Sequence, residues 1–375
     1  MPNAVHQAQR LGQSIWMDYI SREMLVTGEL ERLINLGVVG VTSNPSIFEK
    51  AIATGADYDK DLTAAAKRNL SNKPAYELLA LSDIATAADL LRPTYDITDG
   101  RDGFVSLEVN PALAHDTQGT VEEARRLFAS LSRPNVMIKV PATPEGVPAV
   151  RQLISEGINV NATLIFSLAM YGHVREAYVA GLEDRARQGN LITRTASVAS
   201  FFVSRVDTAV DALLQEAVRR GDGSARALLG KAAVANAKLA YEAYAATFGG
   251  ERFQVLRRLG AQVQRPLWAS TSTKNPAYSD LLYVEPLIGP DTVNTLPPAT
   301  LDALLDHGKA SPTINQDVAE AHATMKRLEA AGVSMTQVTD KLLAEGVKAF
   351  ADSFDKLLAN LEEKLQSMKI GAVAK

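Results

Sequence analysis

The chain has no cysteine, which excludes disulfide bonds, thiolate metal sites and cysteine nucleophiles. Histidine is scarce, and no two histidines have the spacing of metal ligands on one helix. The five are His6, His115, His173, His307 and His322. Neither a Gly-x-Gly-x-x-Gly turn nor a glycine-rich phosphate loop ending in Gly-Lys-Ser/Thr is present. We therefore expect no metal and no cofactor, so any catalysis should depend on side chains.

Long apolar stretches and basic clusters are also missing. No apolar stretch reaches about 18 residues, the minimum for a membrane-spanning helix. The first residues, MPNAVHQAQRLGQS, have neither the basic nor the apolar part of a secretory signal. The net charge is -4, and no run of lysine and arginine forms a patch, which argues against nucleic-acid binding. We expect a cytoplasmic protein that binds neither a membrane nor a nucleic acid.

The sequence does contain a sizeable apolar fraction, 46% of 375 residues, and much of it lies in short runs. Eight runs rich in branched residues alternate with segments of helical periodicity, and no linker-like stretch separates them. This order predicts an α/β fold, a (β/α)8 TIM barrel with additional helices, formed by residues 1–375 as a single domain. The runs are 15–20, 38–44, 104–110, 136–142, 159–166, 195–203, 266–271 and 281–287.

The last predicted helix covers residues 335–368. Its leucines recur at helical spacing, as Leu342, Leu343, Leu357, Leu358, Leu361 and Leu365. A helix with one apolar face is expected to pack on the outside of the barrel, and a contact with a partner chain is the alternative. The chain is accordingly predicted to be a monomer or a homodimer.

One lysine stands inside an apolar run. Val136-Met-Ile-Lys-Val-Pro-Ala142 is typical of a buried strand, apolar on both faces as strands of parallel sheets are. Burial disfavours the charged form of an amine, and a neutral Lys139 amine could attack a carbonyl to form a Schiff base. Alternatively, Lys139 could lie at a strand end, with its charge in solvent or paired with a carboxylate.

Polar residues also stand near the ends of most other predicted strands. Active sites of (β/α)8 barrels lie at the carboxyl ends of the strands, where these side chains would meet. Any one of them could simply be hydrogen-bonded in the core, but together they suggest a polyhydroxylated ligand held around one amine. They are Asp18, Thr42, Asn44, Glu108, Asn110, Asn161, Thr163, Ser200, Ser270 and Thr271.

A Schiff-base lysine needs partners that move protons. Glu108 could shuttle protons during formation and dehydration of the carbinolamine, and Thr163 could hold the shuttling water. Asp18 could take a hydroxyl proton when the neighbouring carbon–carbon bond breaks. The two carboxylates favour the charged ammonium whereas burial favours the neutral amine, and the sequence leaves open which effect prevails at Lys139.

Six motifs, in order along the chain, make it resemble the transaldolases over nearly its full length. They are WMDYISR at 16–22, GVTSNPSIF at 40–48, VSLEVNP at 105–111, MIKVPAT at 137–143, INVNATLIFS at 158–167 and ASFFVSR at 199–205. The resemblance implies a metal-independent barrel enzyme. Such an enzyme transfers a dihydroxyacetone unit from a ketose phosphate to an aldose phosphate in the pentose phosphate pathway.

The same resemblance implies a role for each site residue. Lys139 matches the Schiff-base lysine, Glu108 and Thr163 match the pair around the catalytic water, and Asp18 matches the acid/base for cleavage. Three residues match positions that bind the dihydroxyacetone hydroxyls, and one matches a phosphate-binding arginine. These are Asn44, Asn161, Ser200 and Arg205.

The sequence departs from the family pattern after the seventh strand, where a second phosphate-binding arginine is usual. The segment here is WASTSTKNP, and Lys274 is its only cation, so we expect Lys274 to bind phosphate as a point charge. Two alternatives remain. One is a class I fructose-6-phosphate-type aldolase, whose family lacks a carboxylate at the position of Glu108. The other is a non-catalytic barrel that only binds sugar phosphates.

Overall fold

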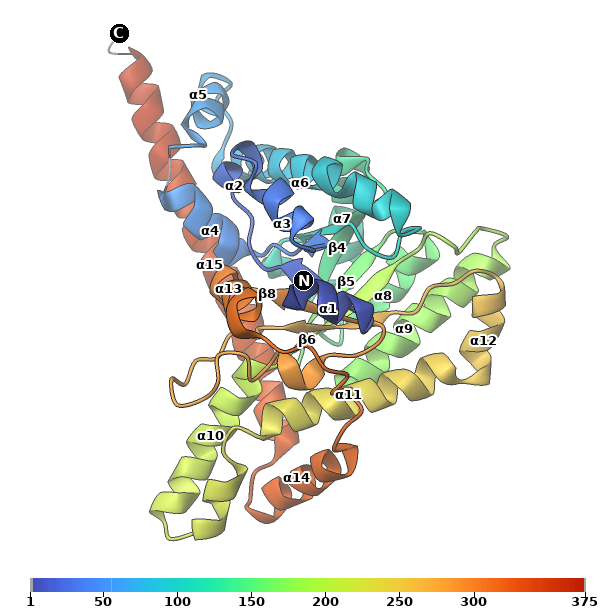
Figure 1. Cartoon of the computed structure of the whole chain (residues 1–375). Helices are drawn as coiled ribbons and strands as arrows, with labels where there is room; N and C mark the ends of the chain where they lie inside the picture. Colours follow the sequence, from blue (N-terminus) through green and yellow to red (C-terminus); the bar gives the residue numbers. More distant parts are fainter. Residues whose placement is uncertain (1–2, 55, 374–375) are drawn as a thin grey trace.

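The computed structural model describes residues 3–54 and 56–373, and eight parallel strands in it close into a barrel in chain order (Figure 1). The last strand pairs with the seventh and with the first, which closes the ring. The predicted (β/α)8 TIM barrel is confirmed. The strands are β1 (Gln13–Met17), β2 (Gly40–Val41), β3 (Phe104–Glu108), β4 (Val136–Pro141), β5 (Val160–Ile165), β6 (Ser197–Phe202), β7 (Arg265–Ala269) and β8 (Thr292–Leu296).

Helices surround this barrel, and α11 and α12 extend beyond it together with α9 at the right of the view (Figure 1). The helices are α1 (Ala4–Arg10), α2 (Arg22–Val26), α3 (Glu29–Asn35), α4 (Pro45–Thr54), α5 (Asp59–Lys67), α6 (Asn72–Ile97), α7 (Thr117–Leu131), α8 (Gly146–Ser155), α9 (Leu168–Arg187), α10 (Ser204–Arg219), α11 (Ala232–Gly249), α12 (Glu251–Arg258), α13 (Pro298–His307), α14 (Val318–Ala330) and α15 (Met335–Val373). Short 3-10 turns are η1 (Pro111–Leu113), η2 (Gly223–Leu228) and η3 (Glu285–Leu287).

The prediction of the eighth strand was wrong. Residues 281–287 form turns and η3, although Leu281, Tyr283 and Leu287 are buried, and Pro286 cannot donate to a strand ladder. The strand is instead Thr292–Leu296, in which three of the five residues are polar, Thr292, Asn294 and Thr295. Such a strand contains no continuous apolar run, so its sequence does not mark it as buried. Its polar side chains are buried nevertheless, because they form hydrogen bonds such as the one that Gln13 donates to Thr292.

Strand register brings residues that are distant in the sequence into one layer of the barrel. Glu108 on β3 is paired with Lys139 on β4, and Lys139 is paired with Asn161 on β5. Side chains at paired positions of parallel strands point to the same face of the sheet. The carboxylate, the amine and the amide therefore stand side by side.

Helix α15 is the longest helix of the described chain and packs against α4, α5, α6 and α10 (Figure 1). The predicted apolar face is confirmed, because Leu342, Leu357, Leu361 and Leu365 are buried. The helix does more than cover the outside of the barrel. It also contacts β5, and the ring of Phe350 lies 5.9 Å from the ammonium nitrogen of Lys139.

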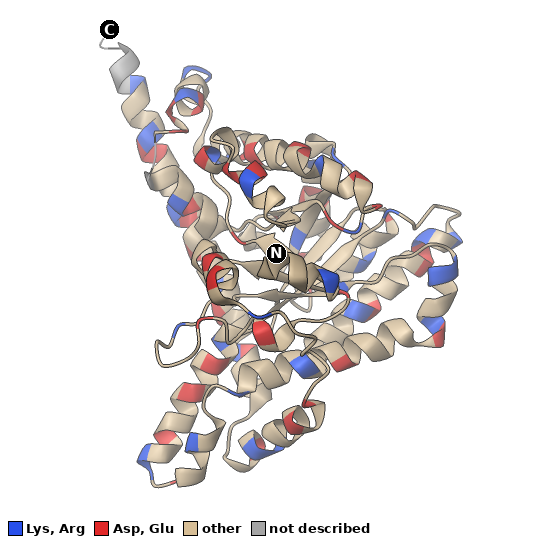
Figure 2. Ribbon diagram, in the orientation of Figure 1, with Lys and Arg blue, Asp and Glu red and all other residues tan. Residues whose placement is uncertain are grey.

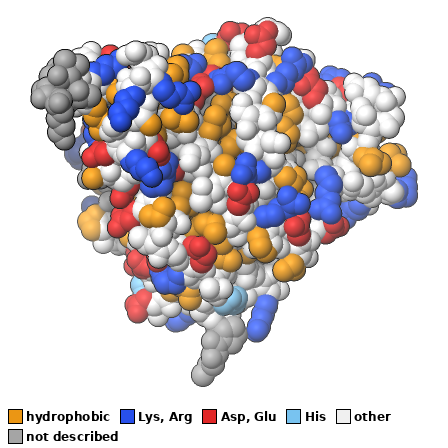
Figure 3. Space-filling view, turned by 90° about the horizontal axis from the view of Figure 1, so that it is seen from above, with side chains coloured by type: hydrophobic (Ala, Val, Ile, Leu, Met, Phe, Trp, Pro, Cys, Tyr) orange, Lys and Arg blue, Asp and Glu red, His pale blue; other side chains and the backbone are white. Residues whose placement is uncertain are grey.

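Charged side chains of both signs alternate along the outer helices (Figure 2). On the face shown in Figure 3, lysine and arginine are interspersed with aspartate and glutamate. Many of them pair, as Arg126 does with Glu77 at 2.7 Å. Among the described residues, no helix is both long enough and apolar enough to cross a membrane.

Candidate active site

Lys139 projects from β4 into the mouth of the barrel, with 5% of its side chain exposed. Its Nζ donates a hydrogen bond to the backbone oxygen of Ser43 at 3.2 Å and lies 4.0 Å from Oε2 of Glu108. The alternative of a lysine in solvent is thereby excluded. A carboxylate is near but beyond hydrogen-bonding distance, so Lys139 is not held in a tight ion pair.

A cavity of about 490 Å³ opens in front of Lys139. The structure brings most of the predicted site residues into its wall, from strands and from the loops that follow them. The predicted residues that line it are Asp18, Thr42, Asn44, Lys139, Ser200, Arg205, Ser270 and Lys274. This volume is within the range of small-molecule sites. We call it the front cavity.

Asp18 lies in this wall and is half-buried. Burial raises the pKa of its carboxyl group, and the positive charges of Lys139, Arg205 and Lys274 act against that rise. Thr42 donates a hydrogen bond to Oδ1 of Asp18 at 2.8 Å. Since its only proton is used there, Thr42 accepts the hydrogen bond from Thr295, whose Oγ1 is 2.7 Å away. Asp18 is thus fixed in one orientation beside the amine.

Asn161 and Ser200 are joined to each other. Ser200 Oγ donates to Asn161 Oδ1 at 2.6 Å, and Asn161 Nδ2 donates to Ser106 Oγ at 3.1 Å. Ser200 lines the front cavity, whereas Asn161 stands behind it in the wall. In this arrangement, the amide of Asn161 orients the serine hydroxyl that faces the cavity.

Asn44 ends the loop after β2 and begins α4. Its side-chain oxygen accepts a hydrogen bond from the backbone nitrogen of Ile47 at 3.0 Å. An asparagine in this role caps the start of a helix. Asn44 is therefore held rigidly where it lines the front cavity.

Glu108 and Thr163 do not line the front cavity. Both oxygens of Glu108 and the hydroxyl of Thr163 are buried without a hydrogen-bond partner in the described part of the chain. Burial raises the pKa of Glu108 to about 7, although the charge of Lys139 acts to lower it. A carboxyl group with such a pKa exists in both protonation states near neutral pH, as a proton shuttle requires.

Two of the cations that line the front cavity, Arg205 and Lys274, were predicted to bind phosphate. Arg205 is near the start of α10, and its guanidinium lies 5.2 Å from the ring centre of Phe202. Burial lowers the pKa of Arg205, and the charge of Asp18 acts to raise it. Lys274 is exposed and donates to Ser272 Oγ at 2.7 Å. Since a helix N-terminus attracts anions, this part of the cavity suits a phosphate group.

Sequence reasoning missed several residues of the front cavity. Thr295 was missed because β8 was misplaced, and a strand-end search would otherwise have found it. Lys50 on α4 and Phe350 on α15 come from helices, where nothing in the local pattern separates them from ordinary surface and core positions. No group of three or more metal-ligating side chains occurs among the residues described.

Comparisons with known proteins agree with this geometry. Residues 15–361 match the family model described as Transaldolase/Fructose-6-phosphate aldolase. The chain is 47% identical to Transaldolase 2 of Nostoc sp. over 373 residues, covering 97% of this chain and 98% of the relative. It is 50% identical to the Transaldolase of Thiobacillus denitrificans over 360 residues, covering 96% and 99%. It is 48% identical to the Transaldolase of Thermobifida fusca over 367 residues, covering 97% and 99%.

Proposed function

This chain belongs to the transaldolase/fructose-6-phosphate aldolase family, and we propose that it is a transaldolase. The reaction moves a dihydroxyacetone unit from a ketose phosphate, sedoheptulose 7-phosphate or fructose 6-phosphate, to an aldose phosphate, glyceraldehyde 3-phosphate or erythrose 4-phosphate. The observation that carries the proposal is the buried amine of Lys139, which faces the front cavity with Asp18 beside it and Glu108 4.0 Å away.

The first half of the reaction uses Lys139 and Glu108. The neutral amine attacks the ketone carbon, and the resulting carbinolamine loses water to form an iminium ion. Glu108 in its acid form gives a proton to the departing hydroxyl, the carbon–oxygen bond breaks, and Glu108 is left as a carboxylate. Thr163 holds the water in this step. The carboxylate then balances the positive charge of the iminium.

The second half uses Asp18. Its carboxylate takes the proton of the hydroxyl on the carbon to be cleaved, and the carbon–carbon bond breaks as its electron pair moves into the iminium. The aldose phosphate leaves, and an enamine remains on Lys139. The raised pKa of Asp18 makes it a stronger base than an exposed aspartate. When the acceptor aldehyde enters, each step runs in reverse.

The remaining residues place the substrate. Asn44 and Ser200 bind the hydroxyls of the dihydroxyacetone unit, with Asn161 supporting them in the wall of the front cavity. Arg205 and Lys274 bind the phosphate. The guanidinium group of arginine offers several N–H donors in one plane, whereas lysine offers a single charged group. Arg205 therefore orients the phosphate, and Lys274 mainly contributes positive charge.

One experiment separates this function from the two alternatives. Fructose 6-phosphate is supplied with and without erythrose 4-phosphate, and borohydride is added to trap any iminium. A transaldolase turns over the donor repeatedly only with the acceptor, and borohydride traps an adduct on Lys139. Turnover without the acceptor would indicate an aldolase instead. An unchanged protein mass after borohydride would indicate a barrel that only binds sugar phosphates.

A further inference from the structure

Arg205 and Lys274 stand between two cavities. Both line the front cavity, and both also line a cavity of about 680 Å³ between α10 and the start of α15. We call the latter the outer cavity. A side chain with open space on two sides is not held in place by close packing. The distance between the two cations must therefore be fixed by the backbone segments that carry them.

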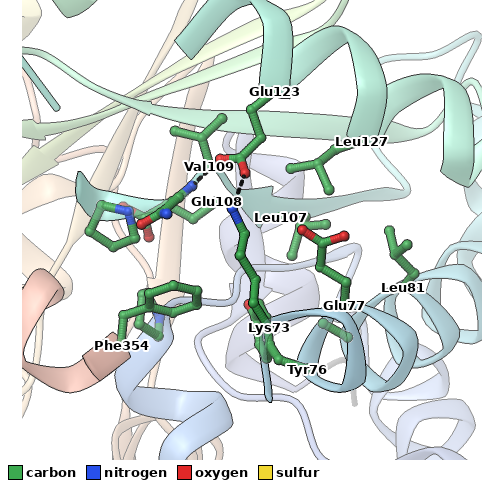
Figure 4. A pocket seen from close by; sticks show the side chains of 14 residues that line it. Lys73, Tyr76, Glu77, Leu81, Leu107, Glu108, Val109, Glu123, Leu127 and Phe354 are labelled. Atoms are coloured by element: carbon green, nitrogen blue, oxygen red, sulfur yellow. Dashed lines mark hydrogen bonds and ion pairs between the residues drawn. The ribbon is translucent and has the colours of Figure 1, made fainter. Parts of the chain in front are cut away.

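Neither of these cations is neutralised at close range. Lys274 donates to the uncharged hydroxyl of Ser272 at 2.7 Å, and neither Lys274 nor Arg205 forms an ion pair in the described part of the chain. Lys73 on α6 shows the opposite case, because it is paired with Glu123 at 3.2 Å beside a small cavity between β3, α6 and α7 (Figure 4). The charges of Arg205 and Lys274 are thus available to an anion.

Lys274 is carried by the connection between β7 and β8. Its neighbours form a closed loop, in which the hydroxyl of Thr273 donates to the backbone oxygen of Ser279 at 2.8 Å. We call residues 273–279 the lysine loop. The four-carbon stem of a lysine is flexible, so the position of the ammonium group depends on how firmly this loop is attached to the rest of the molecule.

Tyr278 attaches the lysine loop to α10. Its hydroxyl donates to Oδ2 of Asp211 at 2.7 Å, and the backbone nitrogen of Gly230 donates to the other oxygen, Oδ1, at 2.9 Å. The carboxylate of Asp211 is buried, and hydrogen bonds to a charged group are stronger than those between neutral groups. Asp211 therefore ties the lysine loop to α10 and to the segment that precedes α11.

Tyr283 repeats this arrangement one helical turn earlier on α10. Its hydroxyl donates to Oδ2 of Asp207 at 3.0 Å, and the backbone nitrogen of Ala233 donates to Oδ1 at 2.8 Å. Asp207 and Asp211 are four residues apart and so lie on one face of the helix. Two tyrosines of the connection between β7 and β8 are thus held by two carboxylates of the helix that also carries Arg205.

The backbone at Gly230 is shaped to receive Tyr278. Its φ is +68°, a conformation that residues with a side chain rarely adopt. A Cβ atom added at Gly230 would lie only 2.8 Å from Cζ of Tyr278, so the missing side chain lets the ring approach the backbone. Burial raises the pKa of the Tyr278 hydroxyl, and its hydrogen bond to Asp211 raises it further. The tyrosine therefore keeps the proton that it donates.

We propose that Tyr278 is a positioning residue for the phosphate group of the substrate, because its bond to Asp211 holds the lysine loop on α10. This bond sets the distance between Lys274 and Arg205. The inference rests on the proposed transaldolase function, in which these two cations bind the phosphate. Neither Tyr278 nor Asp211 lines the front cavity, so both act through the lysine loop and not by touching the substrate.

The attachment acts through the cost of ordering the loop. A phosphate held by both cations immobilises the lysine loop, and ordering a mobile segment on binding lowers affinity. A loop that is already tied to α10 avoids part of that cost. The reacting carbon atoms are handled by Lys139 and Asp18, so the attachment should affect substrate affinity far more than the chemical steps.

The test removes only the hydroxyl of Tyr278. Tyr278→Phe keeps the ring against Gly230, so we expect the variant to fold. Its KM for fructose 6-phosphate, measured with erythrose 4-phosphate as the acceptor, should rise about tenfold, the order of effect that loss of a hydrogen bond to a charged group has. The changes in kcat and in the turnover of unphosphorylated fructose should be much smaller.

A double-mutant cycle separates a positioning role from a merely structural one. In Lys274→Met the lysine loop no longer carries its charge, so adding Tyr278→Phe should raise KM no further. Tyr241→Phe is the matched control. Its hydroxyl donates to the backbone oxygen of Pro290 at 3.0 Å, near the far end of the same connection between β7 and β8. KM should keep its wild-type value in that variant.

Binding of inorganic phosphate, followed by isothermal titration calorimetry, tests the attachment without turnover. Tyr278→Phe should weaken this binding about tenfold as well. The positioning role is overturned if the wild type binds no phosphate, if the variant binds it as tightly as the wild type, or if KM rises equally with and without the charge of Lys274. If the wild type binds phosphate but borohydride traps no adduct with fructose 6-phosphate, the proposed function fails instead, and the calorimetry still decides on the attachment.

Discussion

Lys139 Nζ lies 4.0 Å from Oε2 of Glu108, across paired positions of β4 and β3. The distance is too long for a hydrogen bond and short enough for each charge to act on the other. Burial prevails at Glu108, whose pKa rises to about 7 despite the ammonium beside it. The partner proposed to protonate the leaving hydroxyl is thus largely acidic in mildly acidic solution and titrates near neutrality.

Replacing Lys139 by methionine removes the amine and keeps the length of the side chain. We expect Lys139→Met to fold and to lose both adduct formation and transfer. Mass spectrometry after borohydride and fructose 6-phosphate measures the first, and a coupled assay for glyceraldehyde 3-phosphate measures the second. An adduct on another lysine in this variant would contradict the assigned nucleophile.

Asp18→Asn should leave iminium formation intact and slow carbon–carbon cleavage. An amide cannot accept the hydroxyl proton, and loss of a positioned base costs about 100-fold to 10,000-fold in rate. Trapping experiments report the first step, and release of the aldose phosphate reports the second. A similar loss in both steps would show that Asp18 acts on iminium formation as well.

Arg205→Ala should raise KM for phosphorylated substrates with a smaller change in kcat. The lost charged hydrogen bonds correspond to about tenfold or more in affinity. Unphosphorylated fructose is the control, because its turnover should be nearly the same in the variant and in the wild type. If kcat alone falls, Arg205 does not hold the phosphate.

Glu108 makes stability depend on pH. Its pKa is raised from 4.5 to about 7 in the folded chain, so its acid form is favoured by folding. That contribution is fully present below about pH 4.5 and is lost as pH rises through about 7, a change on the order of 3 kcal/mol. The free energy of unfolding of wild type should therefore fall between pH 5 and about pH 8 relative to that of Glu108→Gln.

Urea unfolding at both pH values measures this difference. Glu123→Gln is a suitable control, because Glu123 is already paired with Lys73. Parallel pH dependence in wild type and Glu108→Gln would mean that Glu108 is not protonated on folding.

Phe350→Ala should admit water to the amine from the side of α15. The ring lies 5.9 Å from Lys139 Nζ and lines the front cavity. We expect lower kcat, and also a stability loss of about 3–5 kcal/mol because the side chain is buried. Phe350→Leu keeps the apolar cover and should recover most of the activity. Equal activity of the two variants would show that the cover is not needed.

The sequence allowed the barrel and the amine to be predicted for related reasons. The alternation of side chains along a strand predicted that Lys139 lies on the interior face of the barrel. The carboxyl ends of the strands predicted that Asp18, Asn44 and Ser200 meet at one mouth of the barrel, as they do in the structure. The pattern failed where burial is achieved by hydrogen bonds, as in Thr292–Leu296. It could not find Phe350, because only the path of α15 through space brings that ring to the amine.

Helix α15 contributes Phe350 to the wall of the front cavity. That wall therefore comes from a segment that is synthesised after β8, the strand that closes the barrel against β1. A nascent chain carries Lys139 long before anything covers it. Carbonyl chemistry at this lysine would thus begin only after α15 has been synthesised, so the appearance of that helix times the onset of activity.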